Sequence, residues 1–394
     1  MMADSYIPRL QTPPKESYFL LGPRGTGKST WLLHHYPHAS RIDFLLGDEE
    51  RRFRAYPERI REVVAGMKPQ ETLILDEIQR VPSLLPEIHA LIEKKCGIQF
   101  ILTGSSARRL RRAVSDLLGG RALLRHMGPF LAAELGSQFS LEKALQVGLL
   151  PLIWQSENVE ERLRTYIQLY LREEVQAEGL VRHLNDFARF LEVASFSYGN
   201  LWTTTEISRE SGVKRTTVDN YLQILEDLFL AFTIPVFSRR SKRKLIAHSK
   251  FYFFDVGVFR ALRPQGILDS KSEMEGLALE GLVAQHLHAW CSMQREPHTL
   301  SFWRTSHQLE VDFVVYGPQG FWAIEVKRSM DLNPQDIKGL SAFQEEYPEA
   351  KCFFVTMSQQ RTVYKNFPVI PITEFLWTLS PSAPSRFGEN SRST

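Results

Sequence analysis

The sequence predicts an α/β protein in three parts: a parallel-sheet domain at the N-terminus, a helical module in the middle and a second α/β domain at the C-terminus. A glycine-rich loop near the start separates an apolar run from a helical segment. Apolar stripes with helical spacing fill the middle third, and acidic side chains recur in helix and strand patterns in the last third. With 394 residues, the chain is long enough for two or three domains with cores of their own.

Composition and charge exclude several classes of protein. The formal net charge is only +3, so the overall charge does not by itself indicate binding to nucleic acid or to a membrane surface. The three cysteines are far apart, which excludes a disulfide framework and a C-x-x-C zinc pair and fits a reducing cytosol. Residues 1–16 lack a signal-peptide pattern, and the longest apolar stretch, residues 228–237, is too short to span a bilayer. We therefore expect a cytoplasmic protein without membrane contact.

A phosphate-binding loop is the clearest motif. The stretch Gly22-Pro23-Arg24-Gly25-Thr26-Gly27-Lys28-Ser29 fits G-x-x-x-x-G-K-[ST] and lies between the apolar run 18–21 and the helical segment 30–36. Glycines let backbone N–H groups turn toward phosphate oxygens, and the helix N-terminus adds a favourable dipole. We expect this loop and Thr30 to bind ATP. The Lys28 ammonium would lie on the β- and γ-phosphates and the Ser29 hydroxyl on Mg²⁺.

Two carboxylates follow a strand-like run. Residues 72–75 are apolar on both faces, as in a central parallel strand, and Asp76 and Glu77 come at its end. We expect Asp76 to bind the same Mg²⁺ as Ser29 and Glu77 to polarise the attacking water. A second strand over 41–45 and a polar helix over 49–66 complete the βαβ spacing.

Polar side chains also follow the next predicted strand, residues 99–102. Thr103 and Ser105 could sense the γ-phosphate or orient the water, or the loop 103–106 could only cap the following helix. Several arginines come next. We select Arg121 as the candidate arginine finger, acting in cis or from a neighbouring subunit, while the other arginines fit a solvated helix face.

These motifs, taken in order, resemble the AAA+ ATPases. The phosphate loop, Leu75-Asp76-Glu77, the loop 102–106 and Gly120-Arg121 carry the resemblance. More narrowly, residues 18–379 resemble a prokaryotic family with this ATPase domain at the N-terminus and a nuclease-like domain at the C-terminus. The segments 170–175 and 252–257 are also similar to that family. The resemblance implies Mg²⁺-dependent ATP hydrolysis and a homo-oligomer with sites at subunit interfaces.

The middle third predicts a helix-turn-helix. Residues 205–213 and 214–222 fit two short helices joined at Gly212, with Val218, Leu222 and Leu225 inward. Side chains of the second helix that could reach bases or phosphates are Lys214, Arg215, Thr216, Thr217 and Asn220. Asp219, Glu226 and Asp227 oppose phosphate contact, so a structural or protein-docking role is the alternative. The basic run 239–244 fits either a DNA-contacting wing or a solvated loop.

Acidic side chains recur in three segments of the last third. Glu280 falls on the same side of a helix, residues 273–290, as Leu277 and Val283, and a carboxylate in core register indicates a site. Strand alternation places Glu310 and Asp312 on one face of residues 309–315, opposite Val311 and Phe313. The same alternation places Glu325 and Lys327 on one face of residues 321–327.

This order of a helix Glu, a strand Asp and a Glu-x-Lys pair resembles the PD-(D/E)xK nuclease fold, which is restriction-endonuclease-like. The resemblance implies that Asp312 and Glu325 are metal ligands, Glu280 an additional acidic ligand and Lys327 the catalytic lysine. Val311 stands where the motif name has proline. Because folds outlive functions, a fold without nuclease activity stays open beside an active one.

We divide the chain into an N-terminal tail (1–16), an AAA+ P-loop domain (17–134), a helical and winged-helix module (135–247), a nuclease-like domain (248–379) and a disordered tail (380–394) rich in Ser, Pro and Gly. The expected function is ATP hydrolysis coupled to action on DNA, with a candidate Mg²⁺-dependent nuclease domain. The alternative is a regulatory or scaffolding ATPase that binds DNA or protein partners without cleavage.

Overall fold

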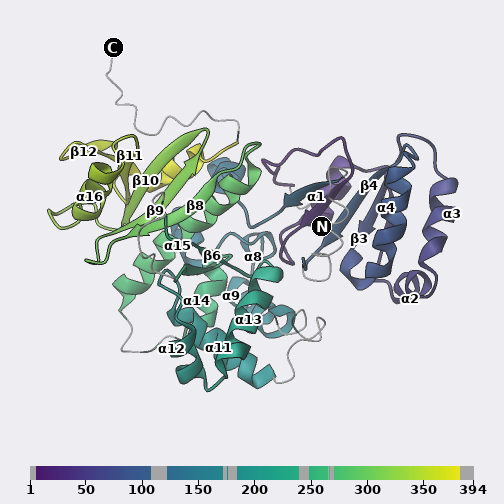
Figure 1. The fold of residues 1–394 in the computed structure, drawn as a ribbon, viewed down its shortest axis with the longest axis horizontal. Coiled ribbons are helices and arrows are strands. Elements are labelled where there is room, and N and C mark those ends of the chain that lie inside the picture. The colour runs from purple at the N-terminus through teal and green to yellow at the C-terminus, as the bar shows by residue number, and fades with distance from the viewer. Residues whose placement is uncertain are drawn as a thin grey trace, which may run out of the picture. The chain divides into compact units, whose positions relative to one another are not determined.

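The computed structural model describes residues 6–107, 122–171, 175, 184–238, 248–264, 266 and 270–381. They belong to two compact units, which we describe separately. The first unit comprises Met1–Pro129 and Gln223–Leu230, and the second comprises Phe130–Leu222 and Ala231–Thr394 (Figure 1). Several predicted features lie outside the described residues: Arg121 and the arginines 108–112, residues 172–174, the basic run 239–244 and residues 382–394 of the predicted tail.

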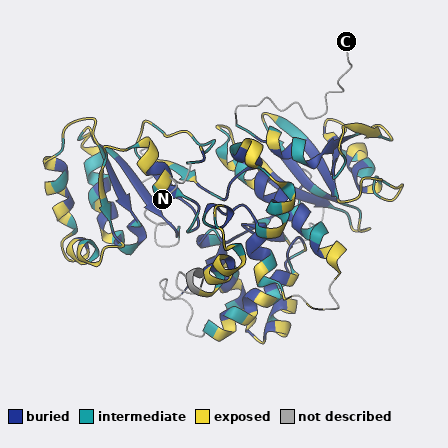
Figure 2. Ribbon diagram, turned by 180° about the vertical axis from the view of Figure 1, so that it is seen from behind, coloured by how far each residue is buried: buried dark blue, intermediate teal, exposed yellow. Residues whose placement is uncertain are grey.

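The first unit contains an all-parallel sheet with the strand order β2-β3-β4-β1-β5. The strands are β1 (Tyr18–Leu21), β2 (Ser40–Asp43), β3 (Thr72–Asp76), β4 (Gln99–Gly104) and β5 (Leu123–His126). Because β1, β3 and β4 are apolar on both faces, they occupy the middle and are almost entirely buried (Figure 2). The predicted N-terminal parallel sheet is confirmed, and β5 is a strand that we did not predict.

Helices cover both faces of this sheet. Trp31 and Leu32 of α1 pack on one face, whereas α2, α3 and α4 pack on the other through residues such as Phe53, Ile60 and Ile88. The helices are α1 (Lys28–His35), α2 (Gly47–Ala55), η1 (Pro57–Arg59), α3 (Ile60–Ala65), η2 (Ile78–Arg80), η3 (Pro82–Leu84) and α4 (Leu85–Glu93). The single polar helix predicted over 49–66 was wrong. Pro57 lacks an N–H and disfavours helical backbone before it, so the segment divides into α2, η1 and α3.

The second unit begins with helices. They are α6 (Ala132–Leu135), η4 (Gly136–Gln138), α7 (Leu141–Val147), α8 (Pro151–Trp154), α9 (Val159–Thr165), η5 (Tyr166–Leu171), α11 (Leu184–Phe196), α12 (Thr204–Ser211), α13 (Arg215–Asp227) and α14 (Val256–Leu262). Gly212 ends α12 with a φ of 71°, a left-handed conformation that favours glycine. Two antiparallel strands, β6 (Ala231–Ile234) and β7 (Lys250–Phe253), follow α13 in the chain. The last residues of α13, from Gln223, belong to the first unit.

A mixed six-stranded sheet completes the second unit, in the order β12-β13-β11-β10-β9-β8. Its strands are β8 (Thr299–Arg304), β9 (Glu310–Gly317), β10 (Gly320–Lys327), β11 (Lys351–Thr356), β12 (Thr362–Tyr364) and β13 (Phe367–Pro371), and its helices are α15 (Lys271–Met293), α16 (Lys338–Glu346) and α17 (Ile372–Thr378). Trp290 of α15 packs on Trp322, while Phe343 of α16 packs on the neighbouring Phe321. Because successive strand residues point to opposite faces, α15 and α16 cover opposite faces of the sheet.

A β-bulge interrupts β9 at Asp312. Ser301 of β8 pairs with Val314, but Trp303 pairs with Val311, so β9 has one extra residue at this point. Simple alternation, which placed Phe313 on the face opposite Asp312, therefore fails. The ring centroids of Phe313 and Tyr252 lie 6.1 Å apart, and the Tyr252 hydroxyl donates a hydrogen bond to Glu280. Glu280 and Asp312 both contact the ammonium of Lys250. The bulge thus turns two successive side chains toward the same region.

Asp255 links two segments of the second unit, the start of α14 and the residues around Leu149. It is fully buried, and its carboxylate accepts hydrogen bonds from the N–H groups of Gly257 and Val258, which begin α14, and from the N–H of Leu149. Burial raises the pKa of Asp255 to about 6, although the backbone donors act to lower it. The segment 252–257, which carries part of the family resemblance, therefore contains a helix cap.

The buried His286 of α15 predicts acid sensitivity of the second unit. Its Nε2 accepts from the Ala132 N–H at 3.0 Å and its Nδ1 lies 2.8 Å from the Leu282 carbonyl, an arrangement that requires a neutral ring. Burial lowers its pKa to about 4. The folded unit then binds fewer protons than the unfolded chain between pH about 6.5 and 4, so stability is lost as pH falls through this window.

We expect this loss to reach about 2 kcal/mol between pH 7 and pH 5. Urea unfolding followed by tryptophan fluorescence measures it, because six of the seven tryptophans lie in the second unit. His286→Asn should show a weaker pH dependence than wild type, and the exposed His307→Asn should not. An unchanged pH dependence in His286→Asn would contradict the assignment.

Within the described ranges, no helix has the length and apolar character needed to cross a membrane.

Candidate functional site

The phosphate loop of the first unit connects β1 to α1. Gly27 caps α1 with a φ of 86°, and a Cβ on Gly22 would meet the Met127 carbonyl oxygen at 2.1 Å, so glycine is required at both positions. The Lys28 ammonium donates to the Gly22 and Pro23 carbonyls at 2.7 and 3.0 Å. Lys28 thus folds back on the loop where the sequence predicts phosphate. Thr30, the last residue of the predicted ATP site, lies on the exposed side of α1.

Ser29 and Asp76 meet at the start of α1 and the end of β3. The Ser29 hydroxyl donates to Asp76 Oδ2 at 3.1 Å, and the Thr103 hydroxyl donates to Asp76 Oδ1. A hydroxyl and a carboxylate are hard oxygen donors, and their meeting beside the phosphate loop fits Mg²⁺. Arg41 of β2 forms an ion pair with the same Oδ2. We did not predict Arg41, because its position depends on the pairing of β2 with β3.

Glu77 has a left-handed backbone, with φ 59° and ψ 45°, which is uncommon for a non-glycine residue and is found at functional sites. Its N–H donates to Thr103 Oγ1 at 3.1 Å, and its Oε2 accepts from Gln79 at 2.5 Å and from Ser105 at 3.2 Å. The predicted Thr103 and Ser105 therefore lie against the two carboxylates. Gln79, which also donates to Ser105 at 3.0 Å, was not predicted.

The helix-turn-helix segment presents a polar surface at the start of α13. Lys214, Arg215, Thr216 and Asn220 are exposed, whereas Val218 and Leu225 are buried and Leu222 is half-buried. Asp219, which opposes phosphate contact, accepts a hydrogen bond of 2.7 Å from the Thr204 hydroxyl of α12. The exposed side chains leave the predicted DNA-reading positions accessible.

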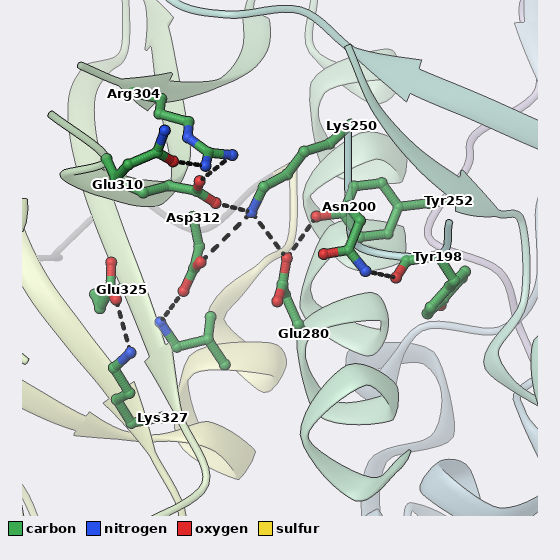
Figure 3. Close-up of polar contacts among 12 residues, drawn as sticks. Tyr198, Asn200, Lys250, Tyr252, Glu280, Arg304, Glu310, Asp312, Glu325 and Lys327 are labelled. Carbon is green, nitrogen blue, oxygen red and sulfur yellow. Dashed lines mark hydrogen bonds and ion pairs between the residues drawn. The ribbon is translucent and has the colours of Figure 1, made fainter. Parts of the chain in front are cut away.

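An acidic centre lies between β7, α15 and β9 of the second unit, and a lysine occupies its middle (Figure 3). The Lys250 ammonium lies 2.6 Å from Glu310 Oε1, 3.2 Å from Glu280 Oε1 and 3.6 Å from Asp312 Oδ1. We use "acidic centre" for these three carboxylates and Lys250. Burial alone would lower the pKa of Lys250, but the three carboxylates outweigh it and raise that pKa above its usual range.

Glu325 and Lys327 form a separate pair on β10. The Lys327 ammonium lies 2.9 Å from Glu325 Oε1, and Glu325 Oε2 is buried without a hydrogen-bond partner. Burial, reinforced by the charge of Asp312, raises the pKa of Glu325 to about 8. Asp312 links the acidic centre to this strand, because its Oδ2 accepts a hydrogen bond of 2.8 Å from the N–H of Val326, which stands between Glu325 and Lys327.

The described carboxylates do not form a metal site as they stand. No group of three or more His, Cys, Asp or Glu side chains in the described part of the chain is arranged to hold a metal ion. Glu280 and Asp312 share the ammonium of Lys250, and Glu325 is paired with Lys327. The assignment of Glu280, Asp312 and Glu325 as metal ligands therefore stays a prediction, and the residues around Lys250 do not fit a divalent ion while Lys250 is in place.

Lys250 was not predicted, although its signal was present in the sequence. It starts a strand whose remaining residues, Phe251–Phe253, are aromatic and buried. A charged residue in the register of a buried strand requires a partner, which is the argument that selected Glu280 on α15. Lys250, in a strand of buried aromatic residues, has the same pattern as Glu280.

Three family models match the chain in succession. An AAA domain matches residues 14–136, a domain of unknown function (DUF8612) matches residues 138–270, and a second such domain (DUF4143) matches residues 275–375. The AAA match covers the phosphate loop, Asp76 and Glu77. The match therefore supports an AAA-type ATPase domain over residues 14–136, with ATP binding and hydrolysis as its activity.

Two curated proteins are similar to most of the chain. The uncharacterized protein Rv2008c of Mycobacterium tuberculosis is 26% identical over 320 residues, covering 79% of this chain and 70% of its own. The uncharacterized protein MJ1544 of Methanocaldococcus jannaschii is 24% identical over 335 residues, covering 77% and 73%. Among solved structures, the Walker-type ATPase PABY2304 of Pyrococcus abyssi is 14% identical, with a TM-score of 0.43, and the match covers 63% of this chain and 91% of that one.

Proposed function

We propose that this protein hydrolyses ATP at the phosphate loop and uses turnover to control binding of DNA through its helix-turn-helix segment, without cutting the DNA. The observation that carries the proposal is the contact between Ser29 and Asp76 beside the phosphate loop, at 3.1 Å. These two side chains would hold Mg²⁺, which supplies charge neutralisation for the β- and γ-phosphates when bound. The setting that we propose is the cytoplasm, where the three free cysteines stay reduced.

Each residue around the loop has a role that its contacts support. Lys28 would exchange the Gly22 and Pro23 carbonyls for phosphate oxygens, which are stronger acceptors for an ammonium. Glu77 would orient the attacking water and accept its proton once Gln79 and Ser105 release the carboxylate. Thr103 bridges Asp76 and Glu77 and would keep the two carboxylates in register.

An arginine finger completes the proposed mechanism. Arg121 remains our candidate for the γ-phosphate, acting in cis or from a second copy of the chain in a homo-oligomer. Arg41 is a second candidate, because it already lies on Asp76 within the same site. Sedimentation with and without ATP would test the homo-oligomer.

The DNA-binding part of the proposal rests on the start of α13. Four exposed polar side chains lie there: Lys214, Arg215, Thr216 and Asn220. In a helix-turn-helix, the first turns of the second helix enter the major groove, where such side chains contact bases and phosphates. The C-terminal domain could either cleave DNA or bind a partner without cleavage. Lys250 favours the second hypothesis, because its ammonium occupies the acidic centre.

The test combines ATP turnover with DNA binding by the purified full chain. Lys28→Ala is expected to abolish ATP binding, whereas the exposed Lys68→Ala is expected to bind ATP normally. Arg215→Ala should weaken DNA binding and reduce the slope of log affinity against log salt by about one. Turnover that persists in Lys28→Ala would contradict the ATP site. DNA affinity unchanged in Arg215→Ala and in a Lys214→Ala/Arg215→Ala double variant would instead favour a protein partner.

A further inference from the structure

Lys250 is enclosed by acidic groups from two structural elements. Its side chain is 4% exposed, and its ammonium contacts Glu280 of α15 and Glu310 and Asp312 of β9 (Figure 3). Glu310 at 2.6 Å and Glu280 at 3.2 Å are within hydrogen-bond distance of the ammonium, and Asp312 at 3.6 Å forms a longer ion pair with it. Three carboxylates therefore surround one buried positive charge.

Each of the three carboxylates also contacts a second protein group. Glu280 accepts from the Tyr252 hydroxyl at 2.7 Å, Asp312 Oδ2 accepts from the Val326 N–H at 2.8 Å, and Glu310 Oε2 lies 3.4 Å from Arg304. Each carboxylate thus has a second donor in addition to Lys250. Protein groups thus neutralise the buried ammonium and share the negative charges, which is how buried charges are tolerated.

A divalent cation would need the oxygens that Lys250 contacts. Mg²⁺ and Mn²⁺ take carboxylate oxygens as ligands, and the nuclease resemblance assigns Asp312 and Glu325 as ligands, with Glu280 as an additional one. Lys250 approaches two of these three, Glu280 at 3.2 Å and Asp312 at 3.6 Å. A dication at the same oxygens would lie within a few ångströms of the ammonium, where like charges repel strongly in a buried site.

We propose that Lys250 is the internal cation of the acidic centre and takes the place of the divalent metal, so that this centre binds no Mg²⁺ or Mn²⁺ in the native protein. The network then has a structural consequence. Lys250 belongs to β7, which pairs with β6 after the helix-turn-helix, whereas its partners belong to α15 and to the six-stranded sheet. The charges therefore fasten β7 to the C-terminal domain of the same unit. Removing the ammonium should open a cation site.

The test is Mn²⁺ titration of the nucleotide-free full chain, with free Mn²⁺ followed by electron paramagnetic resonance. Any Mn²⁺ bound by Ser29 and Asp76 is common to all variants. Wild type and Asp312→Asn are expected to bind the same amount of Mn²⁺. Lys250→Met is expected to gain one Mn²⁺ site per chain that wild type lacks, because the like charge of the ammonium is removed. The Lys250→Met/Asp312→Asn double variant should lose that site.

Matched controls keep the outcome interpretable. Lys351→Met removes an exposed lysine from β11 of the same sheet and should gain no site. If Lys250→Met does not fold, Lys250→Met/Glu310→Gln removes one negative charge with the ammonium and keeps Glu280 and Asp312 for the metal. A Mn²⁺ site in wild type that Asp312→Asn removes would overturn the proposal, and so would a folded Lys250→Met or Lys250→Met/Glu310→Gln protein without an added site. Neither result depends on ATP turnover, so failure of the proposed ATPase function would be seen separately.

Discussion

Glu77→Gln is expected to lower the rate of ATP turnover by about 10²- to 10⁴-fold while ATP binding is retained, because a positioned general base contributes that much to proton transfer. The amide has nearly the same shape as the carboxylate, so it can keep a contact with Gln79 or Ser105. It cannot accept a proton from water. The measurement is steady-state phosphate release with ATP binding followed in parallel.

Glu58→Gln provides the matched control for this variant. Glu58 lies exposed in η1 of the same unit, so the same chemical change there should leave turnover unchanged. A Glu77→Gln protein that binds ATP and releases phosphate at the wild-type rate would remove Glu77 from the role of base. A variant that loses ATP binding as well would indicate a role for Glu77 in forming the pocket.

Asp255→Ala should destabilise the second unit by about 3–5 kcal/mol, because three buried N–H donors lose their acceptor at once. The donors belong to Gly257, Val258 and Leu149. Asp255→Asn keeps an oxygen for the two N–H groups that begin α14 but presents an NH₂ to Leu149, so we expect an intermediate loss. Urea unfolding followed by tryptophan fluorescence measures both variants.

The exposed Asp331→Ala is the control for the Asp255 series and should change stability by less than about 0.5 kcal/mol. The hydrogen bonds predict that stability increases from Asp255→Ala through Asp255→Asn to wild type. Equal stability of Asp255→Ala and wild type would mean that the three donors find other partners. The ranking would also assign the segment 252–257 a role in folding.

Local motifs of the ATP site could be predicted from the sequence because short-range spacing sets their geometry. The phosphate loop, the strand before Asp76 and the strand before Thr103 each combine an apolar run with polar residues at its end, which is the pattern of a parallel sheet. Arg41 could not be found in this way. It reaches Asp76 only because β2 pairs with β3, with Asp43 beside Asp76.

The acidic centre was only partly predictable. Glu280, Glu310 and Asp312 were identified from helix and strand periodicity, and the structure brings all three to Lys250. Their cation is distant in the chain from two of them and carries no local motif. The bulge at Asp312 was also hidden, because an extra residue in one strand is defined by its pairing with the neighbouring strand.

Arg41 and Lys250 differ in whether the charged group can leave its carboxylate partners for solvent. Each forms an ion pair with acidic side chains, but the Arg41 side chain is 27% exposed and the Lys250 side chain only 4%. If Mg²⁺ binds Asp76 as we propose, Arg41 can turn to water or phosphate without leaving its charge in the interior. Lys250 has no such route, since leaving its carboxylates would place an ammonium in a buried, apolar environment. Arg41 is thus a counter-ion that can exchange with solvent, as repeated binding and release of a ligand would require. Lys250 is a fixed counter-ion that stays with its carboxylates.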